Sequence, residues 1–407
     1  MSTTPPAANE FHESRARFSP QTDELNHGVS LRTPTDHRTI KESLALIEPV
    51  AKEFITSFHG RLFAENPKLR GMFPASMSDH GDRLFAAITR IVWSLDSQYA
   101  LDSYAADLGR DHRKFGVIPA HYTAICAAFM ATLRAFLADG WTAEVQGAWQ
   151  DAFDRVSNVM IRAADDDACQ APPWWLGDVV AHDKRGPDIA VLTVRPTQPL
   201  PYRSGQYVSV QCARWPRVWR TYSIANAPRE DGIIQFHVRA IPGGWVSGSL
   251  VHYTRPGDTL LLSRADGTMV PETGSARHVL CVAGGTGLAP IKAIIEQLLH
   301  SITPGAQRRI HLFFGTRKES DLYDLTALRR MASCHPSLQV IPVVSDDAQF
   351  DGIRGLLPDV VARQRTWPDH DVYISGPAGL VRETTQVLTT IGIPITRIYS
   401  DPLGTDA

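Results

Sequence analysis

Apolar residues recur at helical spacing through the first part of the chain. From near Asp36 to about residue 164 they fall three and four positions apart, without strand-like alternation, which predicts an all-α domain. Pro119 suits the first turn of one helix and Gly140 its end, while Thr142 is a candidate N-cap for the next helix. The apolar stripes run over Leu44–Phe58, Leu84–Leu95, Tyr122–Leu137 and Val145–Met160.

The pattern changes after Ala171-Pro172-Pro173. From Trp174, short apolar runs separated by Gly and Pro predict a small antiparallel barrel. From Ala276, fully apolar runs alternate with helical stretches, which predicts a parallel α/β sheet. The predicted strands are Ile189–Val194, Tyr207–Val210, Ile233–Val238 and Thr259–Leu262 in the barrel, then Val279–Ala283, Ile310–Phe314, Leu338–Val344 and Val372–Ile374 in the parallel sheet.

These patterns predict a multidomain chain with four segments. We expect a mobile tail over 1–34, an all-α domain over 35–170, an antiparallel β-barrel over 171–273 and an α/β parallel-sheet domain over 274–407. A chain of 407 residues is also too long for one core.

Composition excludes several classes of function. A formal net charge of -2 gives no indication of a nucleic-acid partner. The sequence shows neither an apolar run of about 18 residues, as a membrane span needs, nor a signal peptide. Five scattered cysteines favour a reducing compartment, so we expect a cytoplasmic protein; its oligomeric state stays open.

A polar motif, Arg220-Thr221-Tyr222-Ser223, lies at the end of a predicted barrel strand. A guanidinium there can neutralise a pyrophosphate, a tyrosine ring can stack on a flat cofactor, and a serine hydroxyl can approach a reactive ring nitrogen. The motif is specific because Gly205-Gln206-Tyr207 precedes it and Gly243-Gly244-Trp245-Val246-Ser247 follows it.

A glycine-rich turn, Gly284-Gly285-Thr286-Gly287, follows the Val279–Ala283 strand and opens a helix. Glycines there let backbone amides approach a dinucleotide pyrophosphate at the helix N-terminus. Gly376-Pro377 forms a second turn after the last strand. Arg317 and Lys318 could meet the adenosine end of a cofactor or be solvated loop charges, so the choice between NADH and NADPH stays open.

In order and spacing, these motifs resemble the ferredoxin-reductase superfamily over about residues 174–402. The resemblance implies FAD on the barrel and NAD(P)H between the two glycine turns. It assigns flavin and phosphate binding to Arg220, Tyr222 and Ser223, and the other phosphate to Ser247 and its neighbouring backbone. The implied cofactor-binding residues are Gln206, Tyr207, Arg220, Thr221, Tyr222, Ser223, Gly244, Val246, Ser247, Gly284, Gly285, Thr286, Gly287, Gly376 and Pro377.

One histidine of the all-α part, His112, ends the run Leu108-Gly109-Arg110-Asp111-His112. A lone histidine at a helix end is usually a surface or capping group. Here Phe58-His59-Gly60-Arg61-Leu62-Phe63 and Met72-Phe73-Pro74 precede it, followed by a helix with His80 and Leu84. This layout resembles a globin, and a globin fused to this type of reductase resembles the flavohaemoglobins over nearly everything after residue 36.

The second resemblance implies a haem b site in the first domain. His112 is then the iron ligand through a neutral imidazole nitrogen. Phe73 packs against the porphyrin, Leu84 joins the cofactor-binding residues, and Tyr122 neighbours the histidine. His59, His80 and Tyr122 are the residues implied to act in catalysis.

The chain departs from the flavohaemoglobin pattern at four places. His59 stands where the family has a distal tyrosine, and His80 stands near the family's distal glutamine. Ala164 aligns with the glutamate that normally pairs with the proximal histidine, which predicts a less anionic His112. The C-terminal aromatic that covers the flavin is missing, and Tyr399 is a weak candidate to replace it.

The two distal histidines admit three interpretations. One of them donates a hydrogen bond to dioxygen at the haem, as the tyrosine would; or His80 binds the iron itself; or His59 is a packed helix residue that points elsewhere.

By resemblance, the expected activity is nitric oxide dioxygenation. Electrons pass from NADH or NADPH to FAD and on to haem iron, and nitric oxide and dioxygen give nitrate. The flavin converts a two-electron donor to a one-electron acceptor. The alternatives are a flavin reductase that serves a quinone, a ferric complex or a redox protein, and a haem-based gas or redox sensor.

Overall fold

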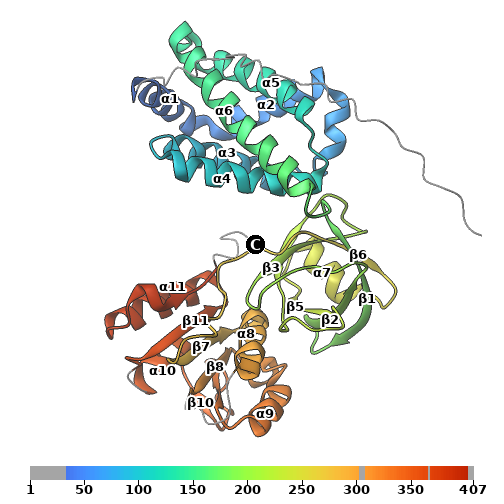
Figure 1. Ribbon diagram of the computed structural model, residues 1–407, viewed down its shortest axis with the longest axis vertical. Helices are drawn as coiled ribbons and strands as arrows, with labels where there is room; N and C mark the ends of the chain where they lie inside the picture. The colour runs from blue at the N-terminus through green and yellow to red at the C-terminus, as the bar shows by residue number, and fades with distance from the viewer. Residues whose placement is uncertain (1–33, 302–307, 365–366, 402–407) are drawn as a thin grey trace, which may run out of the picture.

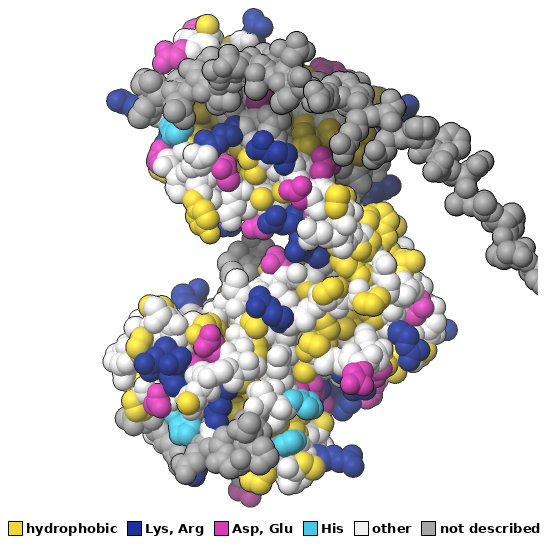
Figure 2. All heavy atoms as spheres, viewed as in Figure 1, with side chains coloured by type: hydrophobic (Ala, Val, Ile, Leu, Met, Phe, Trp, Pro, Cys, Tyr) yellow, Lys and Arg dark blue, Asp and Glu magenta, His cyan; other side chains and the backbone are white. Residues whose placement is uncertain are grey.

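The computed structural model describes residues 34–301, 308–364 and 367–401, which form three domains in chain order (Figure 1). An all-helical domain comes first, an antiparallel barrel second and a parallel α/β domain third. The fold class predicted from the sequence is therefore confirmed. Figure 2 shows a wide gap between the helical and α/β domains on the viewed face, so the barrel connects them there.

The helical domain has more helices than the apolar stripes predicted. Pro49, in a 3-10 turn after Ile47, divides the first stripe into two helices. The helix that carries His112 was not predicted as an element; Ser97 caps it by accepting a hydrogen bond from the Ala100 amide at 3.4 Å. Thr142 caps the last helix as predicted. The helices are α1 (Pro34–Ile47), α2 (Ala51–Glu65), α3 (Ser78–Ser94), α4 (Gln98–His112), α5 (Pro119–Leu137) and α6 (Ala143–Ala168).

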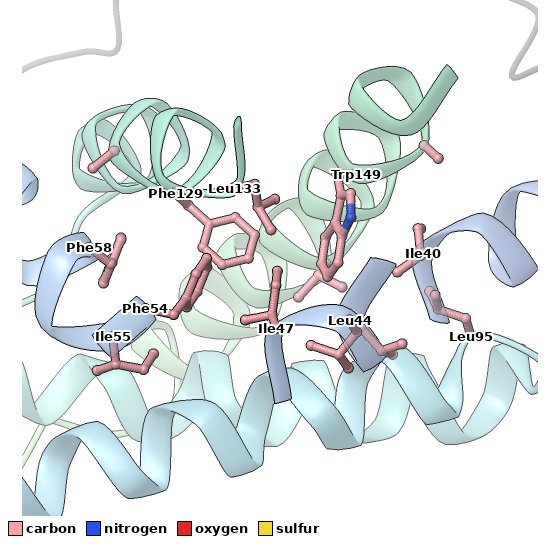
Figure 3. Close-up of a cluster of buried hydrophobic side chains, with 14 of the residues drawn as sticks. Ile40, Leu44, Ile47, Phe54, Ile55, Phe58, Leu95, Phe129, Leu133 and Trp149 are labelled. Atoms are coloured by element: carbon pink, nitrogen blue, oxygen red, sulfur yellow. The ribbon is translucent and has the colours of Figure 1, made fainter. Parts of the chain in front are cut away.

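Aliphatic and aromatic side chains together fill the centre of this domain (Figure 3). The rings of Phe54 and Phe129 meet edge to face at 5.9 Å, and Phe129 meets Trp149 in the same way at 5.6 Å. The buried Trp149 indole donates a hydrogen bond to the Ser43 hydroxyl at 2.9 Å, which satisfies its one polar atom. This core ties α1, α2, α5 and α6 together and sets the positions from which α3 and α4 approach.

Among the described residues, one helical segment, Pro119–Gly140, which contains α5, is long and apolar enough to cross a membrane by length and composition alone. Its residues Phe129 and Leu133 pack in the core of the helical domain.

The barrel is a six-stranded antiparallel sheet in the order β4-β3-β6-β1-β2-β5. An isolated bridge between Ile224 and Phe236 links the two edge strands and nearly closes it. Arg220–Ser223, which was predicted to lie at the end of a barrel strand, forms the whole of the short strand β4. The elements are β1 (Trp175–Lys184), β2 (Ile189–Pro196), β3 (Tyr207–Cys212), β4 (Arg220–Ser223), β5 (Ile234–Arg239), α7 (Trp245–His252) and β6 (Thr259–Leu262).

The third domain is a parallel sheet in the order β10-β9-β8-β7-β11-β12. Its central strands are almost wholly buried, as helices on both faces require. Helix α8 starts directly after the 3-10 turn Gly285–Gly287. The elements are β7 (His278–Gly284), α8 (Leu288–Ser301), β8 (Ile310–Thr316), α9 (Leu325–Cys334), β9 (Leu338–Val344), β10 (Ile353–Arg354), α10 (Leu357–Gln364), β11 (His370–Ser375), α11 (Ala378–Thr390) and β12 (Ile398–Tyr399).

Candidate functional site

A single large cavity extends from the helical domain to the barrel. Its volume is about 1410 Å³, above the roughly 1,000 Å³ that bounds an ordinary ligand pocket. The cavity therefore has room for more than one ligand. Eight of the predicted site residues line it: Phe73, His80, Leu84, His112 and Tyr122 from the helical domain, and Tyr207, Arg220 and Thr221 from the barrel.

His112 ends α4 and is oriented by its own helix. Its Nδ1 lies 2.6 Å from the Leu108 carbonyl oxygen, so Nδ1–H donates and Nε2 keeps a free lone pair. Burial lowers the pKa of His112, which favours the neutral imidazole that binds metals. The ring is thus prepared as a ligand, with a backbone carbonyl rather than a carboxylate behind it.

His80 lines the same cavity from α3. Burial, aided by the Arg83 charge and by repulsion from His59 and His112 whenever these are protonated, lowers the pKa of His80 to about 4. Its imidazole is therefore neutral near pH 7 and can donate one hydrogen bond. The Phe73 ring meets it edge to face at 5.1 Å and limits its movement.

His59 lies behind His80. It is buried in α2, with its ring 5.4 Å from that of His80 and stacked on Phe63 at 5.7 Å. It is absent from the described residues that line the cavity, and its Nε2 has no hydrogen-bond partner among them. Burial and the nearby Arg70 charge lower its pKa to about 4. The geometry favours His59 as a support for His80 rather than as a group that reaches a ligand directly.

The helical part of the cavity fits a haem. Most of its walls are apolar, with Met72, Phe73 and Leu84 near His80 and Ile125 and Phe129 from α5. Tyr122 also faces it, and burial raises the pKa of its phenol to about 12, so the hydroxyl stays neutral. A neutral histidine with Nε2 available, set in such a pocket, is the donor that haem iron takes in globins.

The barrel part of the cavity fits a flavin dinucleotide, but only some of the predicted flavin residues line it. Tyr207, Arg220 and Thr221 face the space, and Arg217 and Arg264 add cations suited to phosphate. The half-buried Tyr222 ring instead packs toward Phe236 at 6.5 Å in the barrel core and is not among the described lining residues. Neither is Ser223, which is buried.

The other predicted barrel residues shape loops. The Gln206 side chain accepts a hydrogen bond from the Arg203 amide at 2.9 Å and donates to the Gly267 carbonyl at 3.2 Å. A Cβ on Gly244 would lie 2.4 Å from the Ser247 hydroxyl, so a larger residue at the start of α7 would displace that side chain. Val246 packs in the barrel core, which leaves only its backbone amide for a phosphate.

The two predicted nucleotide turns touch each other. A Cβ on Gly287 would lie 2.4 Å from the Ser375 carbonyl oxygen, and one on Gly284 would lie 3.3 Å from the Pro377 ring. Gly285 and Gly376 have φ angles of 54° and 152°, which favour glycine. The turns around Thr286 and Pro377 therefore form one surface at the carboxyl ends of β7 and β11.

Several lining residues were missed in the sequence. Trp219 directly precedes the Arg220–Ser223 motif and Trp245 lies inside the Gly243–Ser247 motif, so both could have been noticed there; Arg264 comes from another loop and gave no signal. Tyr399 does not cover the flavin region, because it stacks on Tyr373 at 5.0 Å in the α/β domain. The Asp401 carboxylate instead accepts a hydrogen bond from the Thr268 amide at 2.9 Å, and the residues beyond it lie outside the described part of the chain.

The sequence matches three protein families in the order of these domains. Residues 56–160 match the globins, 178–270 the oxidoreductase FAD-binding domain and 281–386 the oxidoreductase NAD-binding domain. The chain is 24% identical to a flavohemoprotein of Bordetella pertussis, over 92% of this chain and 98% of the relative. Its fold superposes on a flavohemoglobin of Malassezia yamatoensis, with bound FAD and heme, at a TM-score of 0.74 and 18% identity, covering 91% and 99% of the two chains.

The reductase half has closer relatives in sequence. It is 35% identical to the ferredoxin–NAD(P)(+) reductase component of the naphthalene 1,2-dioxygenase system of Pseudomonas putida, over 55% of this chain and 67% of the relative. Its fold also resembles the flavohem-like FAD/NAD-binding domain of a nitric oxide dioxygenase from Vibrio cholerae, at a TM-score of 0.50 and 18% identity, covering 55% and 96%.

A globin followed by FAD- and NAD-binding domains defines a haem and flavin oxidoreductase that draws electrons from NAD(P)H. The chain belongs to the flavohaemoglobins.

Proposed function

We propose that this flavohaemoglobin converts nitric oxide to nitrate with dioxygen and NAD(P)H. One nitric oxide, one dioxygen and one electron balance to one nitrate. The observation that carries the proposal is the shared cavity, in which His80 and His112 line one end and Arg220 lines the other. The flavohemoprotein relatives and the nitric oxide dioxygenase domain of similar fold support it.

The chain's residues have distinct parts in this reaction. His112 holds the haem, which supplies an iron that takes single electrons and binds small gases. The neutral His80 offers an N–H to a ligand in the cavity, and His59 supports it. Arg220 and the start of α7 hold FAD, and the paired turns Gly284–Gly287 and Gly376–Pro377 receive the nicotinamide cofactor.

A rapid-mixing experiment tests the proposal. Protein that has been reduced and exposed to dioxygen is mixed with nitric oxide, and the decay of its haem spectrum is followed together with nitrate formation. We expect decay to accelerate with nitric oxide concentration and one nitrate to form per haem. A decay rate independent of nitric oxide would refute dioxygenation, and would leave the sensor alternative.

A second candidate function has one observation in its favour. The reductase half is 35% identical to a ferredoxin–NAD(P)(+) reductase component but the whole chain only 24% to a flavohemoprotein. In this alternative the flavin serves another acceptor, and the globin is a slow or vestigial haem site. Anaerobic NADH oxidation with a quinone or ferric acceptor, faster than any haem reduction, would support it.

A further inference from the structure

The three residues after the haem ligand face the barrel. Arg113, Lys114 and Phe115 form a 3-10 turn that ends at Gly116, whose φ of 75° turns the chain back into the globin. Arg113 pairs with Asp167 and donates a hydrogen bond to the Ala171 carbonyl at 2.7 Å. Arg264 of the barrel pairs with the same Asp167 at 2.7 Å, so this carboxylate bridges the two domains.

An aromatic contact continues from this turn to the flavin region. The Phe115 ring lies 6.2 Å from the His112 ring and 6.4 Å from the Trp219 indole, edge-on to both. Both separations fall within the roughly 4.5–7 Å of packed aromatic pairs. The Lys114 ammonium lies 5.3 Å from the centre of the Phe115 ring and 5.5 Å from that of the Trp219 ring. These two cation–π contacts stabilise the pairing of the rings.

Trp219 is a fixed end of this contact. Its side chain is buried, lines the shared cavity and directly precedes Arg220 at the start of β4. A continuous series of contacts thus leads from the haem ligand to the predicted flavin site. It passes from His112 to Phe115 and Trp219, and Arg220 is the next residue in the chain.

We propose that Phe115 and Trp219 are positioning residues that provide the packed route for electrons from flavin to haem. Electronic coupling falls steeply with separation and is weaker across gaps than through atoms in contact, so a bridge of two packed rings is effective. Each transfer oxidises the reduced flavin by one electron and reduces ferric iron to ferrous; the proton that the flavin loses passes to solvent. The inference rests on the flavohaemoglobin electron path and does not need nitric oxide chemistry.

The test is a single turnover in the full-length protein loaded with haem and FAD, without dioxygen or nitric oxide. NADH is mixed in, and flavin and haem reduction are followed separately. In Phe115→Leu and Trp219→Leu we expect unchanged flavin reduction but haem reduction slowed by about tenfold or more, as small misplacements of reacting groups can cause. Phe115→Tyr, which keeps the ring, should restore the rate.

A matched control and two further measurements make the result specific. Phe136→Leu removes a similar edge-on ring contact, to Phe54 at 5.4 Å, away from this route, and should leave haem reduction unchanged. The haem midpoint potential and the hydrogen exchange of the Arg113–Gly116 amides should not change in Phe115→Leu.

Two outcomes would overturn the proposal. The first is haem reduction at the wild-type rate in both leucine variants. The second is slow reduction together with faster exchange of the Arg113–Gly116 amides or a shifted potential, because the residues then act only in domain docking or on the iron. Absence of nitrate formation in the wild-type protein, with normal haem reduction, would count against dioxygenation alone, so failure of the proposed function is distinguished from failure of this route.

Discussion

A Cβ atom on Gly109 would lie 2.2 Å from the carbonyl oxygen of Met160. Helices α4 and α6 therefore cross at their closest possible approach three residues before His112. This contact holds α4 against α6 within one turn of the haem ligand. An internal constraint of the globin core thus acts directly on the functional site.

The first prediction concerns this crossing. Gly109→Ala should destabilise the globin domain by about 1–3 kcal/mol or more, because the added methyl group forces the helices apart. It should also weaken haem retention. Denaturant unfolding followed at the haem band, and transfer of haem to an acceptor protein, measure the two effects.

Gly60→Ala is the matched control. Gly60 lies in α2 with nothing within 4 Å of its added Cβ. This substitution should stabilise the domain by about 0.5–1 kcal/mol, since alanine is the better helix former. Equal effects of the two substitutions would show that the crossing is not tight in solution.

The second prediction separates the two distal histidines. His80→Leu removes an N–H that lines the cavity, a hydrogen bond worth about 1 kcal/mol, so dioxygen should leave the reduced protein about fivefold faster. His59→Leu should have a smaller effect, because its ring lies behind His80. Flash photolysis measures both dissociation rates. An altered ferric absorption spectrum in His80→Leu alone would instead indicate that His80 binds the iron.

The third prediction concerns the paired nucleotide turns. Gly287→Ala should abolish flavin reduction by NAD(P)H, because its Cβ would lie 2.4 Å from the Ser375 carbonyl oxygen and push the turns apart. Gly379→Ala, whose Cβ meets only the Arg382 guanidinium at 4.0 Å, should reduce flavin normally. Stopped-flow flavin bleaching measures this step, and photoreduced Gly287→Ala should still reduce its haem. Normal NADH turnover in Gly287→Ala would contradict the assigned site.

Sequence patterns predicted the helices and strands well in segments where the apolar residues follow a single spacing, either that of a helix or that of a buried strand. The apolar strands of the α/β domain and the capped helix after Thr142 are examples. Helix α4 was missed because its apolar face is interrupted by small and charged residues and its burial comes from close crossing with α6. The division of the first stripe was missed although Pro49 marks it.

Sequence motifs predicted one residue at each end of the shared cavity, but they did not predict how the side chains between them are oriented. His112 and Arg220 were identified because their neighbours in sequence carry a recognisable order. The orientation of Tyr222 into the barrel core and the withdrawal of His59 from the cavity depend on packing between elements far apart in sequence. The same holds for Phe115 against Trp219, since no local pattern predicts a contact between domains.

The last prediction concerns acid stability of the α/β domain. His370 at the start of β11 is buried, and its two ring nitrogens have no hydrogen-bond partner among the described residues. The groups around it are His278 on the adjacent strand β7, His311 on β8 beyond it, Asp369 and Asp371 beside it in sequence, and the Trp367 ring at 5.0 Å. Burial, with the positive charges of His311 and His278, lowers its pKa from 6.5 to about 4.

A lowered histidine pKa fixes the sign of the pH effect. The unfolded chain binds a proton at His370 below about pH 6.5 and the folded chain only below about pH 4, so stability falls as the pH drops through that window, by an order of 3 kcal/mol. Above pH 6.5 the group has no effect. His370→Phe keeps an aromatic ring without the titration, so its unfolding free energy should fall less over the same window. Thermal and denaturant unfolding at pH 7, 6, 5 and about 4 measure the difference. Parallel curves for wild type and His370→Phe would show that the histidine is already solvated in the folded domain.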